Sequence, residues 1–78
     1  MNALRRKRLA EILSSIEDLK SNLEDVLSEE EDYRDNIPEN LQGSTRYETA
    51  DEACDSIQSA IDALDEATEN IEEIEGVS

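Results

Sequence analysis

The sequence contains no histidine, no tryptophan and no phenylalanine, and it has only two glycines and one cysteine. Without histidine the chain lacks the commonest general base, the usual nitrogen ligand of zinc and the Glu-x-x-His motif of di-iron helical bundles. Two glycines do not supply a phosphate-binding loop, and a lone cysteine without histidine is a poor nucleophile. These absences predict that the protein is not an enzyme and has no catalytic residue, metal site or cofactor.

Long apolar runs and basic residues are also scarce. No apolar stretch approaches the length of a signal-peptide core or a membrane span, so we expect a cytoplasmic protein. The chain has 22 acidic and seven basic residues, which gives a formal net charge of -15. Nucleic acids and anionic membranes should repel such a chain, so its expected partners are basic protein surfaces. Cys54 cannot form an internal disulfide, which leaves a reduced thiol or a disulfide across a dimer open.

The apolar residues that are present follow a seven-residue repeat in two segments, and they occupy its first and fourth positions. Alternating spacings of three and four place such residues on one side of a helix. The positions are Leu9, Ile12, Ile16, Leu19, Leu23 and Val26 in the first segment, and Ala50, Ala53, Ile57, Ala60, Leu64, Ala67, Ile71 and Ile74 in the second. The repeat predicts one helix over about 3–35 and another over about 45–75, within a single domain of residues 1–78.

The segment between the two repeats has the composition of a loop. Pro38 disfavours helical angles at the preceding residue and cannot donate a backbone hydrogen bond. We therefore expect a loop over 36–44, with Pro38, Leu41 and Gly43 as its turn residues. Thr45 and Glu48 have the spacing of a capping box, which predicts that the second helix starts there. A short loop between two long helices indicates that they fold back on each other.

One register satisfies both repeats. When Leu9 is placed opposite Ile74, each first position of one helix faces a fourth position of the other, and the turn centres between Leu41 and Gln42. The sequence therefore predicts an all-α fold, an antiparallel two-helix coiled-coil hairpin. Its predicted core consists of Leu9, Ile12, Ile16, Leu19, Leu23, Val26, Ile57, Leu64, Ile71 and Ile74.

Four apolar residues at the fifth position of the repeat remain outside this seam. They are Leu13, Leu27, Cys54 and Ile61. They either widen the core or form a face that docks on a partner. We favour a docking face for a second copy of the chain, because two hairpins packed together close a four-helix bundle.

The acidic residues form long stripes on the outer positions of both helices. A predicted acidic binding face comprises Glu17, Asp18, Glu24, Asp25, Asp62, Asp65, Glu66 and Glu69. The stripes are either a solvated face or a mimic of a nucleic-acid backbone. One chain has about one charge per 2.5 Å of its length, and a dimer would approach the ~1.7 Å per charge of duplex DNA. The basic run 5–8 should lie at the open end of the hairpin, where it is expected to neutralise Glu69, Glu72, Glu73 and Glu75.

The segment 35–48, DNIPENLQGSTRYE, followed by Ala50 and Ala53, resembles a known group of proteins. These are small acidic helical-hairpin proteins of Gram-positive bacteria and their phages, which carry a similar Pro-Glu-Asn-Leu-Gln turn before an Ala/Glu-rich helix. The resemblance covers the middle third to half of the chain. It implies a phage or mobile-element context in the cytoplasm of a bacterial host cell, and it transfers no functional residue because that group has no established activity.

Three functional hypotheses follow from the sequence. The first is a non-enzymatic protein–protein interaction module, a homodimer that docks on a basic protein surface. The second is a phage-type DNA mimic that inhibits a host nuclease or another nucleic-acid-binding defence protein, and the third is a purely structural oligomerising element. None of them involves direct binding of the chain to nucleic acid or to a membrane.

Overall fold

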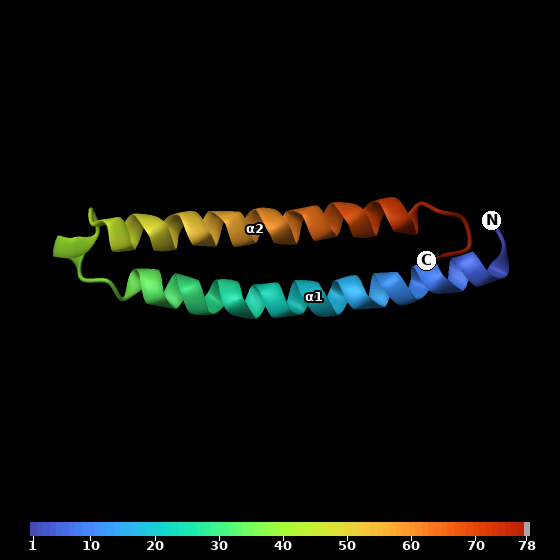
Figure 1. Ribbon diagram of the computed structural model, residues 1–78, viewed down its shortest axis with the longest axis horizontal. Helices are drawn as coiled ribbons and strands as arrows, with labels where there is room; N and C mark the ends of the chain where they lie inside the picture. Colours follow the sequence, from blue (N-terminus) through green and yellow to red (C-terminus); the bar gives the residue numbers. More distant parts are fainter. Residues whose placement is uncertain (78) are drawn as a thin grey trace.

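The computed structural model describes residues 1–77, and within them it contains helices and no strand. Helix α1 spans Ala3–Asp35, a 3-10 turn η1 spans Glu39–Leu41, and helix α2 spans Thr45–Glu72. The two long helices lie side by side and antiparallel in an elongated hairpin of 59 × 15 × 13 Å (Figure 1). The prediction of an all-helical hairpin is confirmed, although α2 ends at residue 72 and not at about 75.

A polar side chain caps the N-terminus of each long helix. The backbone amide of Arg5 donates to Asn2 Oδ1 at 2.8 Å, and the amide of Tyr47 donates to Ser44 Oγ at 3.4 Å. Such bonds satisfy amides that have no partner within the helix. The cap of α2 is therefore Ser44, one residue before the predicted Thr45, which is instead the first residue of the helix.

The loop between the helices is ordered by short-range hydrogen bonds and by one buried side chain. The amide of Asn36 donates to the carbonyl of Asp32 at 3.0 Å and ends α1, and the amide of Leu41 donates to the carbonyl of Pro38 at 2.8 Å. Ile37 is 5% exposed, whereas Leu41 is 44% exposed. The apolar side chain buried beneath the loop is thus Ile37, and the predicted turn residue Leu41 remains largely in solvent.

The seam between the helices follows the first and fifth positions of the repeat, not the first and fourth. On α2 the buried side chains are Ala50, Cys54 and Ile61. On α1 the half-buried residues include Leu13 and Leu27. The half-buried first-position residues of the predicted core are Leu9, Ile16, Leu23, Ile57, Leu64 and Ile71, and Ile74 is half-buried as well.

Three residues of the predicted core lie outside the seam. Ile12 and Val26 are each 47% exposed and Leu19 is 54% exposed. The composition of α2 explains the difference, because its fourth positions hold only alanine at 53, 60 and 67, whereas its fifth positions hold Cys54 and Ile61. Rotating α2 by roughly 50° about its axis exchanges small side chains for larger ones in the seam, which buries more apolar area.

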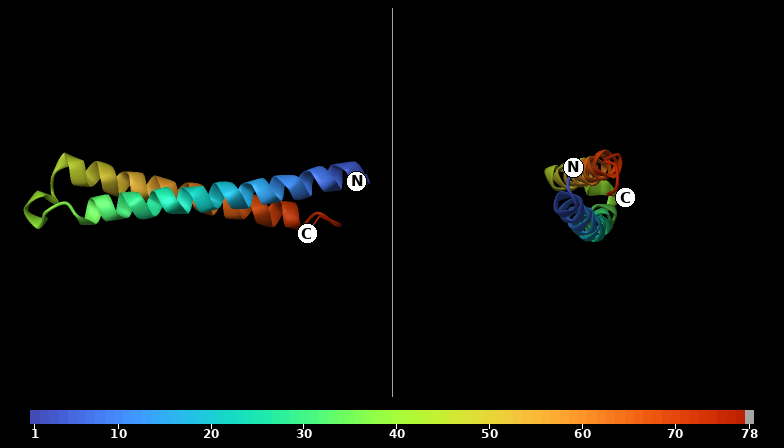
Figure 2. Two further views of the ribbon diagram at one scale, coloured as in Figure 1. Left: turned by 90° about the horizontal axis from the view of Figure 1, so that it is seen from below. Right: turned by 90° about the vertical axis from the view of Figure 1, so that its right-hand side faces the viewer.

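The residues that contact each other across the two helices lie close to the positions that the predicted register pairs. Lys20 pairs with Asp65, and Arg34 pairs with Asp51. Leu19 and Leu64, which the register sets opposite each other, line the same groove between the helices. Seen from the side, α1 and α2 cross at a shallow angle, as paired helices that wind around each other do (Figure 2).

At the open end the chain folds back after α2. Gly76 has φ 86°, in the left-handed region that favours glycine, and Val77 is 8% exposed. Arg6 lies against Gly76, since a Cβ built on this glycine would lie 2.7 Å from Arg6 Cδ. The sequence predicts that the basic run 5–8 pairs with the acidic residues 69, 72, 73 and 75. Within residues 1–77 it forms no ion pair with them, so this prediction is wrong. Arg6 instead meets the backbone, because α2 stops early and the chain turns back.

Candidate interaction surfaces

One long side of the hairpin carries two ion pairs between the helices. Lys20 Nζ lies 2.6 Å from Asp65 Oδ1. The hydrogen bond and charge of Asp65 raise the pKa of Lys20, and the nearby carboxylates of Glu24 and Glu17 raise it further. Three members of the predicted acidic binding face therefore surround a single lysine on this side.

Arg34 forms the second connection, near the turn. Its Nη1 lies 3.0 Å from Asp51 Oδ1, and its Nε lies 3.0 Å from Asp35 Oδ1. The pKa of Arg34 is raised, first by the hydrogen bond to Asp35 and also by the bond to Asp51, so the guanidinium is charged at every accessible pH. We call the face that carries Lys20–Asp65 and Arg34–Asp51 the ion-pair side.

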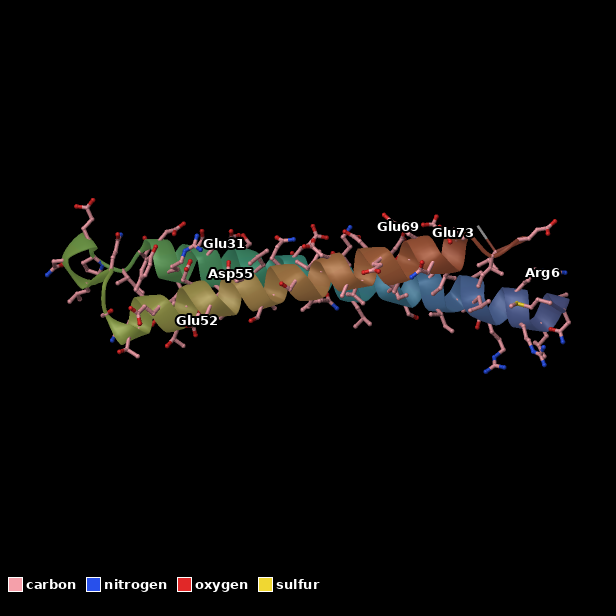
Figure 3. All side chains as sticks on the ribbon, turned by 90° about the horizontal axis from the view of Figure 1, so that it is seen from above. Arg6, Glu31, Glu52, Asp55, Glu69 and Glu73 are labelled. Atoms are coloured by element: carbon pink, nitrogen blue, oxygen red, sulfur yellow. The ribbon has the colours of Figure 1, made fainter. Side chains whose placement is uncertain are left out.

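The other predicted acidic residues project into solvent around the hairpin. Asp18, Asp25, Asp62, Glu66 and Glu69 are exposed, and none belongs to an ion pair of residues 1–77. Figure 3 shows labelled carboxylates on both helices, from the turn to the open end, where Arg6 lies. The predicted acidic binding face is thus not one flat surface, because its residues occupy the ion-pair side and the outer sides of both helices.

The predicted apolar docking face does not exist as a surface. Cys54 and Ile61 are each 4% exposed, and Leu13 and Leu27 are half-buried. All four belong to the hairpin seam for the reason given above. Burial raises the pKa of the Cys54 thiol, and the helices enclose it, so the free thiol is not placed to bridge two copies.

The opposite long side carries exposed apolar residues, and three of them, Ile12, Leu19 and Val26, belong to the predicted core. Ile12, Leu19, Val26 and Tyr33 are between 47% and 54% exposed along α1. Exposed Ala60 and Ala63 of α2 lie beside them. A groove of about 470 Å³ runs between the two helices here, lined by Leu19, Asn22, Leu23, Val26, Ala60, Ala63 and Leu64. We call this face the apolar side.

A signal in the sequence marks the apolar side. The apolar side consists of the fourth and seventh positions of both repeats, and the signal is that these positions almost lack acidic residues. In 9–36 and 50–76, Glu29 is the only acidic residue among them. The other seventh positions on the groove side hold small or uncharged residues such as Ser15, Asn22, Ser56 and Ala63. In a chain with 22 acidic residues, an absence of charge is as informative as a cluster of apolar residues.

Residues 1–77 contain no group of three or more His, Cys, Asp and Glu side chains placed to hold a metal ion. In the same residues, neither long helix combines the length and apolar character needed to cross a membrane. No protein-family model matches the chain, and no curated protein or solved structure matches it significantly.

Proposed function

We propose that the protein is a non-enzymatic binding module, a homodimer whose acidic outer sides dock on a basic surface of another protein. The observation that carries this proposal is the excess of carboxylates without basic partners. Within the described residues, Asp35, Asp51 and Asp65 form the ion pairs, while most of the 22 acidic side chains are exposed to solvent.

Electrostatics gives such a surface a natural partner. Like charges crowded along two helices repel one another and oppose folding, and a basic partner relieves that repulsion when it binds. The resulting attraction accelerates association and weakens as salt is added. Neither ion pair between the helices lies on the outer sides, so binding there leaves the contacts that tie α1 to α2 intact.

The distribution of the acidic residues favours one specific kind of target as a second candidate. They run along the ion-pair side and the outer sides of an elongated rod of 59 Å instead of covering one patch, and phosphates likewise follow the length of a duplex. A groove that normally holds nucleic acid would therefore fit the rod, and the protein would act as a DNA mimic that inhibits a nuclease or another nucleic-acid-binding defence protein. Competition by duplex DNA separates this candidate from docking on other basic surfaces.

The test compares two variants with equal changes in charge. In the test variant, Asp18→Asn, Asp25→Asn, Asp62→Asn and Glu66→Gln remove four exposed charges from the predicted acidic binding face. The control variant carries Glu29→Gln, Glu39→Gln, Glu73→Gln and Glu75→Gln, which are exposed on the apolar side, in the loop or after the end of α2. Each is immobilised beside the wild type, and proteins captured from a bacterial lysate are identified and then titrated in purified form.

We expect the wild type and the control variant to capture the same basic protein, which about 0.5 M salt releases, since the Debye length then falls below ~5 Å. The test variant should bind it at least tenfold more weakly. Retention of full affinity by the test variant would contradict the proposal. If duplex DNA displaces the wild type from that protein, the DNA-mimic candidate gains direct support.

A further inference from the structure

The apolar side is too large and too exposed for an isolated hairpin. Within the described residues, the 33-residue helix α1 has no buried side chain. The total accessible surface of 5685 Å² exceeds the roughly 4,800 Å² expected for a compact chain of 8.8 kDa, because a two-helix rod of 59 × 15 × 13 Å covers little of its own surface. Large exposed apolar faces on small proteins mark places where another molecule packs.

We propose that a second copy of this chain covers the apolar side and that the two hairpins form a four-helix bundle. The inference deepens the proposed function, from which it takes the homodimer. It moves the interface from the predicted row of Leu13, Leu27, Cys54 and Ile61 to the exposed row of Ile12, Leu19, Val26 and Tyr33. The alanines at 60 and 63 allow the α2 helices of the two copies to approach closely.

Charge determines which side of the hairpin a second copy can cover. Two chains of net charge -15 repel each other on almost every side, and the apolar side is where their approach brings the fewest carboxylates together. The area is also sufficient. The full long side of the hairpin, 59 × 15 Å, spans roughly 900 Å², so a copy that covers all of it reaches the ~800 Å² per partner of an interface of standard size.

The charge distribution along the hairpin also sets the orientation of the two copies. Residues 1–8 and 69–77, at the open end, hold four basic and four acidic residues. The rest of the chain holds 18 acidic and three basic residues. An antiparallel arrangement of the two hairpins sets the acidic turn end of one copy beside the neutral open end of the other, and it stacks α1 on α1. The two-fold axis then passes near Asn22, at the middle of the groove.

The first experiment measures mass by sedimentation equilibrium for the purified chain alone. The wild type at about 50 µM, a concentration at which a dimer with a Kd of ~1 µM is mostly associated, should have a mass close to that of two 8.8 kDa chains. The variant L19N/V26N should have the mass of one, and the control S21N/S28N, on the outer positions of α1, should keep the mass of two. A monomeric wild type, or a dimer that L19N/V26N leaves intact, would overturn the proposal.

The second experiment does not depend on weakening the interface. In N22C the new thiols of two copies lie together at the two-fold axis, so a short bis-maleimide should link more than about half of the chains into dimers. In S21C the thiol lies on the outside of α1, and we expect less than about one tenth of that yield. Equal yields from N22C and S21C would overturn the antiparallel packing of the two copies.

Both experiments use the chain without any basic partner. Their failure would leave the charge-dependent binding of a basic protein standing, and failure of the charge-neutralised variant to lose binding would leave the dimer standing. The dimer and the charge-dependent binding therefore fail separately.

Discussion

At the scale of single residues, Cys54 shows how the seam controls reactivity. It lies on the buried face of α2 and is 4% exposed. Its surroundings on α1 include Arg34 and the carboxylates of Glu31 and Glu30. Burial disfavours the charged thiolate more strongly than Arg34 favours it, so the thiol combines poor access with a raised pKa.

We predict that Cys54 reacts with a disulfide reagent such as DTNB at least about 100-fold more slowly in the folded chain than in denaturant, because only the exposed thiolate attacks. The variant S21C provides the control, since its added thiol lies on the outside of α1 and should react in the first rapid phase. Labelling of Cys54 at the rate of that exposed thiol would show that the seam is not closed around α2.

Lys20 provides a prediction about pH. Asp65 raises its pKa in the folded chain above the ordinary value of 10.5. A raised folded-state pKa stabilises the fold fully below the unfolded-state pKa, and this contribution disappears as the pH rises through the folded-state pKa. We therefore expect the free energy of unfolding of the wild type to fall more steeply above pH 10.5 than that of Lys20→Met. Chemical denaturation at several pH values measures the difference, and parallel pH profiles would contradict it.

At the scale of the elements, α2 determines which side of each helix is buried. A seam built from first and fourth positions would leave Ile61 on the surface, but the structure buries it. We predict that Ile61→Ala lowers the free energy of unfolding by about 2–4 kcal/mol, as truncations of buried isoleucine do. The exposed Ser59, two residues away on α2, gives the control, since Ser59→Ala should change it by less than ~0.5 kcal/mol. Similar urea midpoints for the two variants would place Ile61 outside the core.

The two glycines differ in a way that the sequence does not reveal. Gly76 has φ 86°, and a Cβ there would lie 2.7 Å from Arg6 Cδ, whereas a Cβ on Gly43 would have no neighbour within 4 Å. We predict that Gly76→Ala destabilises the hairpin by about 1–2 kcal/mol, the usual cost of left-handed angles for alanine. Gly43→Ala should be neutral or stabilising by up to ~1 kcal/mol. Thermal unfolding of both variants measures this, and the opposite order would contradict the fold-back of the C-terminal end.

The lengths of the helices follow from periodicity and from the loop around Pro38, both of which are local. The choice of seam is not local. On α1 the first and fourth positions are the more apolar pair, because Lys20 and Arg34 interrupt the fifth positions. The seam nevertheless follows the fifth positions, because the fourth positions of α2 hold alanine at 53, 60 and 67. Arg34 and Lys20 satisfy their charges by pairing with acidic residues of α2, so they tolerate half-buried positions beside the seam.

The candidate surfaces were less predictable for the same reason. Rotation of the seam moved Leu13, Leu27, Cys54 and Ile61 inward and exposed Ile12, Leu19 and Val26 instead. The acidic stripes could be identified from the sequence because they occupy outer positions in either seam. The sequence did not show which acidic residues lie on the ion-pair side and which lie on the outer sides. The contacts of Lys20 with Asp65 and of Arg34 with Asp51 show this.

At the scale of the whole molecule, the hairpin separates two kinds of surface. Carboxylates cover the ion-pair side and the outer sides, and the apolar side has exposed Ile12, Leu19, Val26 and Tyr33 beside a shallow groove. In the proposed dimer, the apolar sides of two copies meet and the carboxylates face outward from both hairpins. A basic partner would then encounter a thicker rod with twice the negative charge.

Small-angle X-ray scattering with a mass measurement on the same sample tests this account most directly. Antiparallel packing of two hairpins side by side doubles the mass from 8.8 kDa but leaves the long dimension close to the 59 Å of one hairpin. We predict a particle of two chains that is thicker and not appreciably longer. A particle with the mass of one chain, or one of two chains joined end to end with nearly twice the length, would contradict the account.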